Sequence, residues 1–141
     1  MRSVKRVEND AEFQLAYNIR VKVFVEEQNV PVEIESDEYD KIAIHVLALE
    51  DGEPVGCGRV VFFDDYAKIG RVAVLMDKRK SGFGKIVCEE LLNIAVENGA
   101  KKAVLHAQCV ASKFYETLGF TPEGEIFDED GIDHIKMVKV L

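Results

Sequence analysis

The stretch DKRKSGFGK, from Asp77 to Lys85, decides how this sequence is interpreted. It places four cationic side chains around two glycines, in a chain whose formal net charge is −8. It lies between a strand-forming run, AKIGRVAV (67–74), and an amphipathic helical run that begins at Gly82. The first amides of a helix have no partners within it, and the helix dipole adds about half a positive charge there. The stretch therefore predicts a phosphate site.

Two familiar phosphate loops do not fit this stretch. A P-loop needs glycine where Arg79 stands and serine or threonine where Ile86 stands. A dinucleotide-binding fingerprint needs a third glycine where Val87 stands. A solvated basic surface is the plain alternative, but the dipole disfavours cations at a helix start that holds no anion. Glycines also let a diphosphate approach the amides closely, so an anion site is the preferred interpretation.

The rest of the chain predicts an α/β (α+β) fold. A helix is expected after Asn9 or Asp10, either of which can cap it. Three strand-like runs joined by short turns form an antiparallel meander: 45–50, 54–63 and 67–74. After the helix at 82–99 come a strand, a short helix and a hairpin: 101–108, 110–120 and 128–140. A strand–helix–strand connection implies one parallel pair within a mostly antiparallel sheet. The acidic segment Val32–Lys41 is expected to be a loop.

Composition narrows the class of protein. A chain of 141 residues with 48% hydrophobic residues fits one globular domain over residues 1–141. Its 26 acidic residues against 18 basic ones argue against nucleic acid or an anionic membrane as partner. Neither a signal peptide nor a membrane-length apolar run is present, and three cysteines without Cys-x-x-Cys spacing indicate reduced thiols. We therefore expect a cytoplasmic protein.

At this point the sequence resembles a known family. Arg79-x-x-Gly82-x-Gly84, directly after GRVAV, resembles the acyl-CoA loop of the GNAT superfamily of CoA-dependent N-acetyltransferases. The segment ASKFYETLGF (111–120) is similar to a second motif of that superfamily. The front half, with IRVKVFVEEQNVP, SDEYD and then His45, resembles the ElaA-like subgroup. The resemblance implies a mixed sheet that is splayed at its centre and flanked by helices, with acetyl-CoA as co-substrate and no metal.

The resemblance also implies where acetyl-CoA binds. The diphosphate would lie on the backbone of seven residues: Arg79, Lys80, Ser81, Gly82, Phe83, Gly84 and Lys85. The pantetheine arm would pair with the backbone of Val72, Ala73 and Val74. Gln108 stands where relatives often carry an asparagine that touches this arm. Tyr115 matches the family's tyrosine and is the expected general acid, because a phenol with a pKa near 10 stays protonated at neutral pH.

The general base is less determined. Many relatives carry a carboxylate on the strand before the loop, but Gly70 and Arg71 stand there. Four residues remain as candidates, of which the last two are preferred: Glu26, Asp40, Glu27 and His45. Two other histidines are interpreted as core or surface residues: His106 and His134. Arg20 and Arg59 either line the acceptor site or pair with the acidic segment.

The expected function is transfer of an acetyl group from acetyl-CoA to a primary amine of a small molecule or protein, by direct attack in a ternary complex. The acidic segment would suit a cationic acceptor, or is a solvated surface. Two alternatives stay open: a CoA-binding sensor without turnover, and a nucleotide-phosphate binder with another fold. The resemblance further implies a possible homodimer.

Overall fold

The computed structural model describes residues 1–141, which form seven strands and four α-helices. The strands are β1 (Arg2–Arg6), β2 (Ile44–Glu50), β3 (Glu53–Phe62), β4 (Tyr66–Val74), β5 (Lys102–Gln108), β6 (Thr121–Glu129) and β7 (Ile132–Val140). The helices are α1 (Asp10–Arg20), α2 (Val32–Glu35), α3 (Phe83–Glu97) and α4 (Ser112–Thr117). A π-helix (Val21–Glu27) continues α1, and short 3-10 turns occupy Glu38–Lys41, Met76–Lys78 and Cys109–Ala111.

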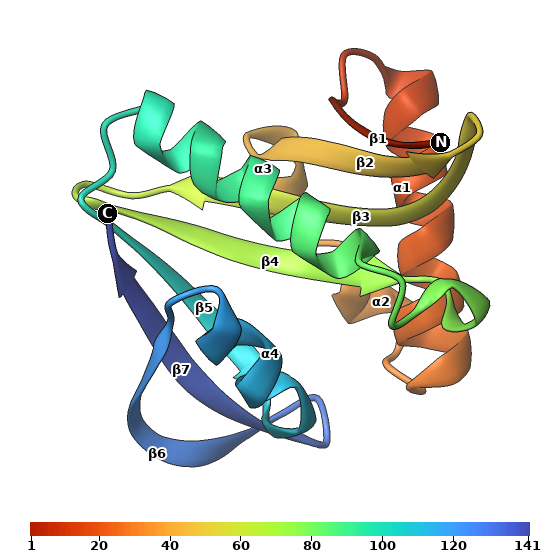
Figure 1. Cartoon of the computed structure of the whole chain (residues 1–141). Coiled ribbons are helices and arrows are strands. Elements are labelled where there is room, and N and C mark those ends of the chain that lie inside the picture. The colour runs from red at the N-terminus through yellow and green to blue at the C-terminus, as the bar shows by residue number, and fades with distance from the viewer.

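All strands join one sheet in the order β1-β2-β3-β4-β5-β7-β6. Only β4 and β5 run parallel, and the other neighbouring pairs are antiparallel. Helix α3 crosses one face of the sheet and α1 lies against the other (Figure 1). This confirms the predicted meander and the single parallel pair. A parallel pair requires a crossover connection, which here is right-handed and passes through α3. This crossover places the start of α3 beside the end of β4.

The first helix begins where its capping residue predicts. The side chain of Asn9 accepts a hydrogen bond from the amide of Glu12, which fixes the first turn. The acidic segment Val32–Lys41 differs from the prediction, because it forms α2 and a 3-10 turn rather than a loop. Long-range ion pairs, described below, hold this otherwise aperiodic segment in place.

Two hydrophobic clusters cover the two faces of the sheet. The larger lies under α3, whose buried residues include Phe83, Val87 and Leu91 as the helical spacing predicts. The smaller lies under α1 and includes Ile19 and Val23. Because each face has its own core, the strands between them are held firmly and present a rigid frame for a site.

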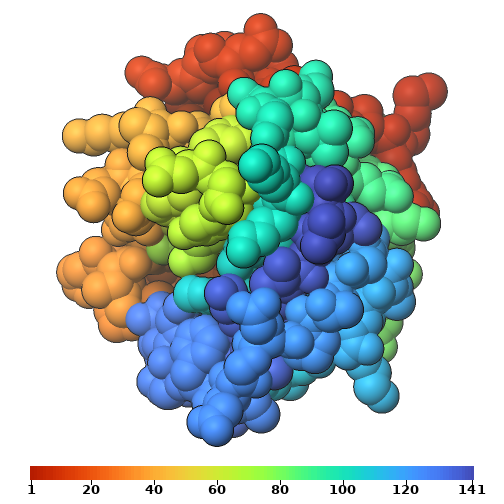
Figure 2. Space-filling model, turned by 90° about the vertical axis from the view of Figure 1, so that its left-hand side faces the viewer, coloured from red at the N-terminus to blue at the C-terminus, as the bar shows by residue number.

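The sheet splits after the first residues of β4. Arg71 has φ 52°, and the register with β3 shifts at this position, which marks a β-bulge. Strand β4 pairs with β5 only from Tyr66 to Lys68, and the two strands then diverge (Figure 1). At the opposite end the surface is closed, where the turn before β4, the start of β5 and the chain's end pack side by side (Figure 2). A wedge opens between β4 and β5 as expected.

Gly58 lets α3 approach the sheet closely, which gives a test of the packing. A Cβ at this position would lie 2.8 Å from both Leu91 Cδ1 and Val87 Cγ1. We expect Gly58→Ala to lower the free energy of unfolding by about 1–3 kcal/mol, measured by urea denaturation. The matched variant is Gly70→Ala, whose Cβ would meet only Arg59 Nε at 4.0 Å, so its stability should change little. Equal effects of the two variants would contradict this packing.

Candidate active site

A cavity of about 790 Å³ fills the wedge between the diverging strands. Its lining joins the C-terminal half of β4, the end of β5, the π-helix and the β6–β7 turn. Seven of the predicted site residues line it: Glu27, Val72, Ala73, Val74, Arg79, Gln108 and Tyr115. The edge of β4 that faces β5 has no strand partner beyond Lys68, so its backbone is open to a ligand except at the Val74 carbonyl oxygen, which accepts from Arg79.

The loop before α3 presents free backbone donors. No amide N–H from Lys80 to Lys85 makes a hydrogen bond within the protein. Gly82 has φ +90° and precedes the helix, while the Phe83 side chain is buried in the core and anchors the loop. Consecutive unpaired amides at the start of a long helix are the donors that a diphosphate needs.

Half of the loop's cations are already engaged. Lys78 pairs with Glu50, and Arg79 forms a bidentate pair with Glu27 at 2.6 and 2.7 Å. Lys80 and Lys85 have no carboxylate within 4.0 Å and remain available for an anion. The charge on the loop is therefore divided between structural pairs and free cations.

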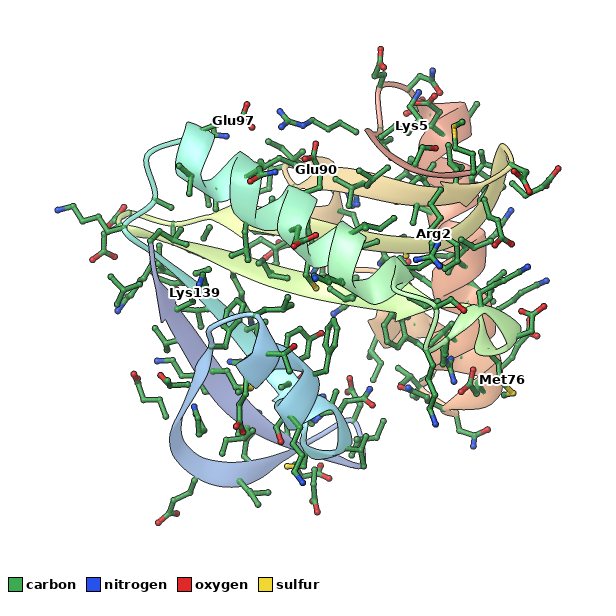
Figure 3. All side chains as sticks on the ribbon, in the orientation of Figure 1. Arg2, Lys5, Met76, Glu90, Glu97 and Lys139 are labelled. Atoms are coloured by element: carbon green, nitrogen blue, oxygen red, sulfur yellow. The ribbon has the colours of Figure 1, made fainter.

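Sequence reasoning missed a third free cation. Arg2 comes from the distant N-terminal strand and lies beside the start of α3 (Figure 3). Its guanidinium carbon is 5.3 Å from the centroid of the Phe83 ring, and it has no acidic partner. A Cβ added to Gly82 would lie 2.7 Å from Arg2 Nη1, so the glycine also makes room for this side chain.

Tyr115 is held by its aromatic neighbours with its hydroxyl free. Its ring packs edge-to-face against Phe114 and Phe120, at centroid distances of 5.1 and 6.0 Å. The hydroxyl makes no hydrogen bond, yet the protein has no buried side-chain N or O atom without a partner. The hydroxyl therefore reaches open space. Burial raises the pKa of Tyr115 above its ordinary value, so the phenol keeps its proton at neutral pH.

Comparisons with known proteins identify this arrangement. The family model for the acetyltransferase (GNAT) domain matches residues 8–141. The chain belongs to the GNAT acetyltransferase family. The N-acetyltransferase YjcF of Bacillus subtilis is 38% identical over 133 residues, which cover 93% of this chain and 94% of YjcF. The crystal structure of Escherichia coli ElaA matches with a TM-score of 0.87 and 28% identity, over 99% of each chain.

A more distant structure shares the fold. A GNAT family acetyltransferase from Elizabethkingia anophelis, solved with acetyl-CoA bound, shares the fold with a TM-score of 0.76 and 17% identity, over 99% of this chain and 98% of that one. The present GNAT protein is an acetyl-CoA-dependent N-acetyltransferase, and its free amides and open β4 edge fit that co-substrate. None of its helices combines the length and apolar character that crossing a bilayer requires.

Glu27 of this GNAT enzyme lies at the cavity but is paired. Hydrogen bonds from Arg79 lower the pKa of the Glu27 carboxyl below its ordinary value. A carboxylate with a lowered pKa accepts protons less readily, so its position favours a role in holding Arg79. Arg79 in turn donates to the Val74 carbonyl oxygen at 3.0 Å, which ties the loop to the end of β4.

The structure places His45 outside the cavity. It is buried in β2, with its Nε2 atom 3.0 Å from the carbonyl oxygen of Asp40 and its ring against Phe13. Burial lowers the pKa of His45. Glu26 is exposed and does not line the cavity either, and Asp40 belongs to a separate ion network. Of the four candidates for the general base, only Glu27 lines the cavity.

The acidic segment pairs with arginines of the protein itself. Arg20, only 1% exposed, donates to both carboxylate oxygens of Glu35 and both of Asp40. Arg59 binds Asp37 and Asp40 at 2.7 Å. The hydrogen bonds from Arg59 lower the pKa of Asp37 to about 2. Of the two interpretations left open, pairing with the acidic segment is confirmed for both arginines, and Arg59 also borders the cavity.

A second polar group at the cavity was not predicted. His106 on β5 and His134 on β7 both line it, together with Glu129 at the end of β6. Sequence reasoning interpreted both histidines as core or surface residues. Strand alternation contained a signal, because it puts His106 on the same face as Gln108, the residue expected to touch the pantetheine arm. No pattern in the sequence predicts that Glu129 lies on that face.

Proposed function

We propose that this enzyme transfers the acetyl group of acetyl-CoA to a primary amine of a small molecule or protein, by direct attack in a ternary complex. The observation that carries the proposal is the cleft that brings together Arg79 of the loop before α3, an unpaired strand edge and Tyr115, with the unpaired amides of Lys80–Lys85 following Arg79 in the chain. Each of these three features suits a different part of acetyl-CoA.

The loop supplies affinity for the diphosphate. Unpaired amides from Lys80 to Lys85 would donate to its oxygens, and the free cations Arg2, Lys80 and Lys85 would add charge. Hydrogen bonds to a charged acceptor are the strong ones in proteins. The unpaired edge of β4 at Val72–Val74 would pair with the amides of the pantetheine arm, as a peptide adds to a sheet edge.

Direct attack is favoured because no cysteine lines the cavity. Cys57 and Cys88 are buried, and burial raises the pKa of each thiol to about 12. Cys109 is not among the lining residues. An acyl-cysteine intermediate would need an accessible thiolate, so we assign the attack to the amine itself. Tyr115 would protonate the departing CoA thiolate.

Release of free CoA thiol tests this function. Wild type and Tyr115→Phe are assayed with lysine, putrescine and a lysine-containing peptide. We expect kcat of Tyr115→Phe to fall by about 10²–10⁴ while the KM for acetyl-CoA changes little, because the phenol donates only during the reaction. Tyr66→Phe is the matched control, since Tyr66 does not line this cavity. If wild type binds acetyl-CoA but no amine accelerates thiol release, the sensor alternative replaces the enzyme.

A further inference from the structure

We infer that His106 is the base that deprotonates the acceptor amine, and that Glu129 positions it. This inference rests on the proposed function, and it names a residue for the step that the sequence left without one. An amine with a lysine-like pKa near 10.4 is uncharged in only about one of two thousand molecules at pH 7. A charged ammonium has no lone pair for attack, so a base must remove a proton first.

The hydrogen bond of His106 fixes its tautomer. Its Nδ1 atom lies 3.1 Å from Glu129 Oε1. Because a carboxylate only accepts hydrogen bonds, Nδ1 carries the proton and Nε2 of the neutral ring has a free lone pair. The Nε2 atom makes no hydrogen bond in the protein, and no buried side-chain nitrogen lacks a partner. Nε2 is therefore accessible from open space, and His106 lines the cavity.

Neighbouring residues hold the imidazole in this orientation. The Phe127 ring meets the His106 ring edge-on, with centroids 5.1 Å apart. The His106 side chain is 30% exposed, which lets a ligand reach it while Glu129 and Phe127 fix the ring on two sides. A base held in one rotamer loses little entropy on reaction, which is the property expected of a catalytic imidazole.

His134 extends the arrangement on the other carboxylate oxygen. Its Nδ1 donates to the Ile132 carbonyl oxygen at 2.7 Å, and its Nε2 lies 3.6 Å from Glu129 Oε2. Glu129 thus lies between two imidazoles, with one carboxylate oxygen on His106 and the other facing His134.

The other charged groups around the His106 end of the cavity come from β4, β6, β7 and the β6–β7 turn. Lys136 is its cross-strand partner on β7 and is paired with Glu123 of β6 at 3.1 Å. Lys68 of β4 and Asp130 of the β6–β7 turn also line the cavity. Glu123 offsets the charge of Lys136. Glu129 is the carboxylate that directly contacts the His106 imidazole.

The proposed step balances as follows. His106 Nε2 takes one proton from the ammonium, and the freed lone pair forms the C–N bond with the thioester carbonyl carbon. The C–S bond breaks as Tyr115 gives its proton to sulfur, and the second proton of the nitrogen restores the phenol. The products are the amide, free CoA thiol and a proton on His106, which passes to solvent.

A pair of isosteric amines tests the base directly. Ethylamine is protonated at pH 7.5, whereas 2,2,2-trifluoroethylamine is uncharged and needs no base before attack. We expect His106→Gln to lower kcat/KM for ethylamine by about 100-fold or more, and for trifluoroethylamine by less than about threefold. An equal loss for both amines would overturn the inference, because a purely structural role does not distinguish them. Tyr66→Phe is the control outside this cavity, and neither rate should change.

A second measurement needs no acceptor. The ¹⁵N chemical shifts of the His106 ring in wild type and Glu129→Leu report which ring nitrogen of the neutral imidazole carries the proton. We expect Nδ1–H in wild type and a shift towards Nε2–H in Glu129→Leu, because the carboxylate that accepts from Nδ1 is gone. An unchanged tautomer would overturn the positioning role of Glu129. If wild type acetylates neither amine nor any member of the wider panel, the proposed function fails, while these shifts still decide the His106–Glu129 pair.

Discussion

Replacing Gly84 with aspartate is expected to weaken acetyl-CoA binding strongly without weakening the fold. Gly84 is the second residue of α3, among the unpaired amides that face the expected diphosphate. A carboxylate there would repel the diphosphate by about 4 kcal/mol for charges about 4 Å apart at an effective dielectric constant near 20. We expect the Kd for acetyl-CoA, measured by calorimetry, to rise at least about 100-fold.

The same substitution should leave the free energy of unfolding unchanged or higher. Aspartate in the first turn interacts favourably with the helix dipole, and a residue other than glycine gains helix propensity. A Cβ at Gly84 would lie 3.4 Å from Phe114 Cζ, which is a normal contact. The expected outcome is therefore opposite signs for stability and affinity, which a misfolded variant would not produce.

Two control variants separate the effect of the added charge on the Kd from the effects of side-chain size and of position. Gly84→Asn has nearly the same shape without the charge, so its Kd should lie at least about tenfold below that of Gly84→Asp. Gly99→Asp adds the same carboxylate beyond the other end of α3, where nothing lies within 4 Å of an added Cβ, and should not change the Kd. If Gly84→Asp bound acetyl-CoA as tightly as wild type, the phosphate loop would be assigned wrongly.

The features of this protein that the sequence predicted depend on residues that are close together in the chain. The Asn9 cap, the Asp51-Gly52 turn and the helical spacing of α3 depend on contacts within a few positions. The loop before α3 belongs to the same class, because unpaired amides follow from a helix start alone. These features were enough to predict the fold, whereas the acetyl-CoA site at this loop stays a prediction.

What the sequence left undecided depends on pairs that are far apart in the chain. Arg2 reaches the phosphate loop across the whole meander, and Glu129 reaches His106 only because β7 pairs β6 with β5. Charge composition gives no information about such pairings. The acidic segment likewise looked solvated, although Glu35 is 2% exposed and fully bonded to arginine. The acidic residues of this segment thus serve structure, where the sequence left either a surface for a cationic acceptor or a solvated surface.

Arg20→Met should be the most destabilising single substitution in this network. Arg20 and Glu35 have side chains only 1% exposed, and Arg20 also binds Asp40. Burial by itself disfavours the charged arginine, but its bonds to Asp40 and Glu35 more than offset this and raise its pKa. Removing the guanidinium leaves Glu35 as a buried charge with Arg71 as its remaining neighbour, 3.4 Å away. Losing one partner of a buried pair costs about 3–5 kcal/mol, which urea unfolding at pH 7 measures.

The double variant Arg20→Met/Glu35→Leu shows whether the cost comes from the unpaired charge. With both partners apolar, position 35 no longer holds a buried carboxylate without its partner. Asp40 keeps its bond to Arg59. We expect the double variant to regain most of the lost stability, as apolar replacements of buried ion pairs do. Arg6→Met provides the exposed comparison, since Arg6 pairs with Glu90 and Glu97 on the outer face of α3 and should shift the midpoint little (Figure 3). A double variant no more stable than Arg20→Met would mean that the arginine acts through packing instead, because only the desolvated charge of Glu35 distinguishes the two proteins.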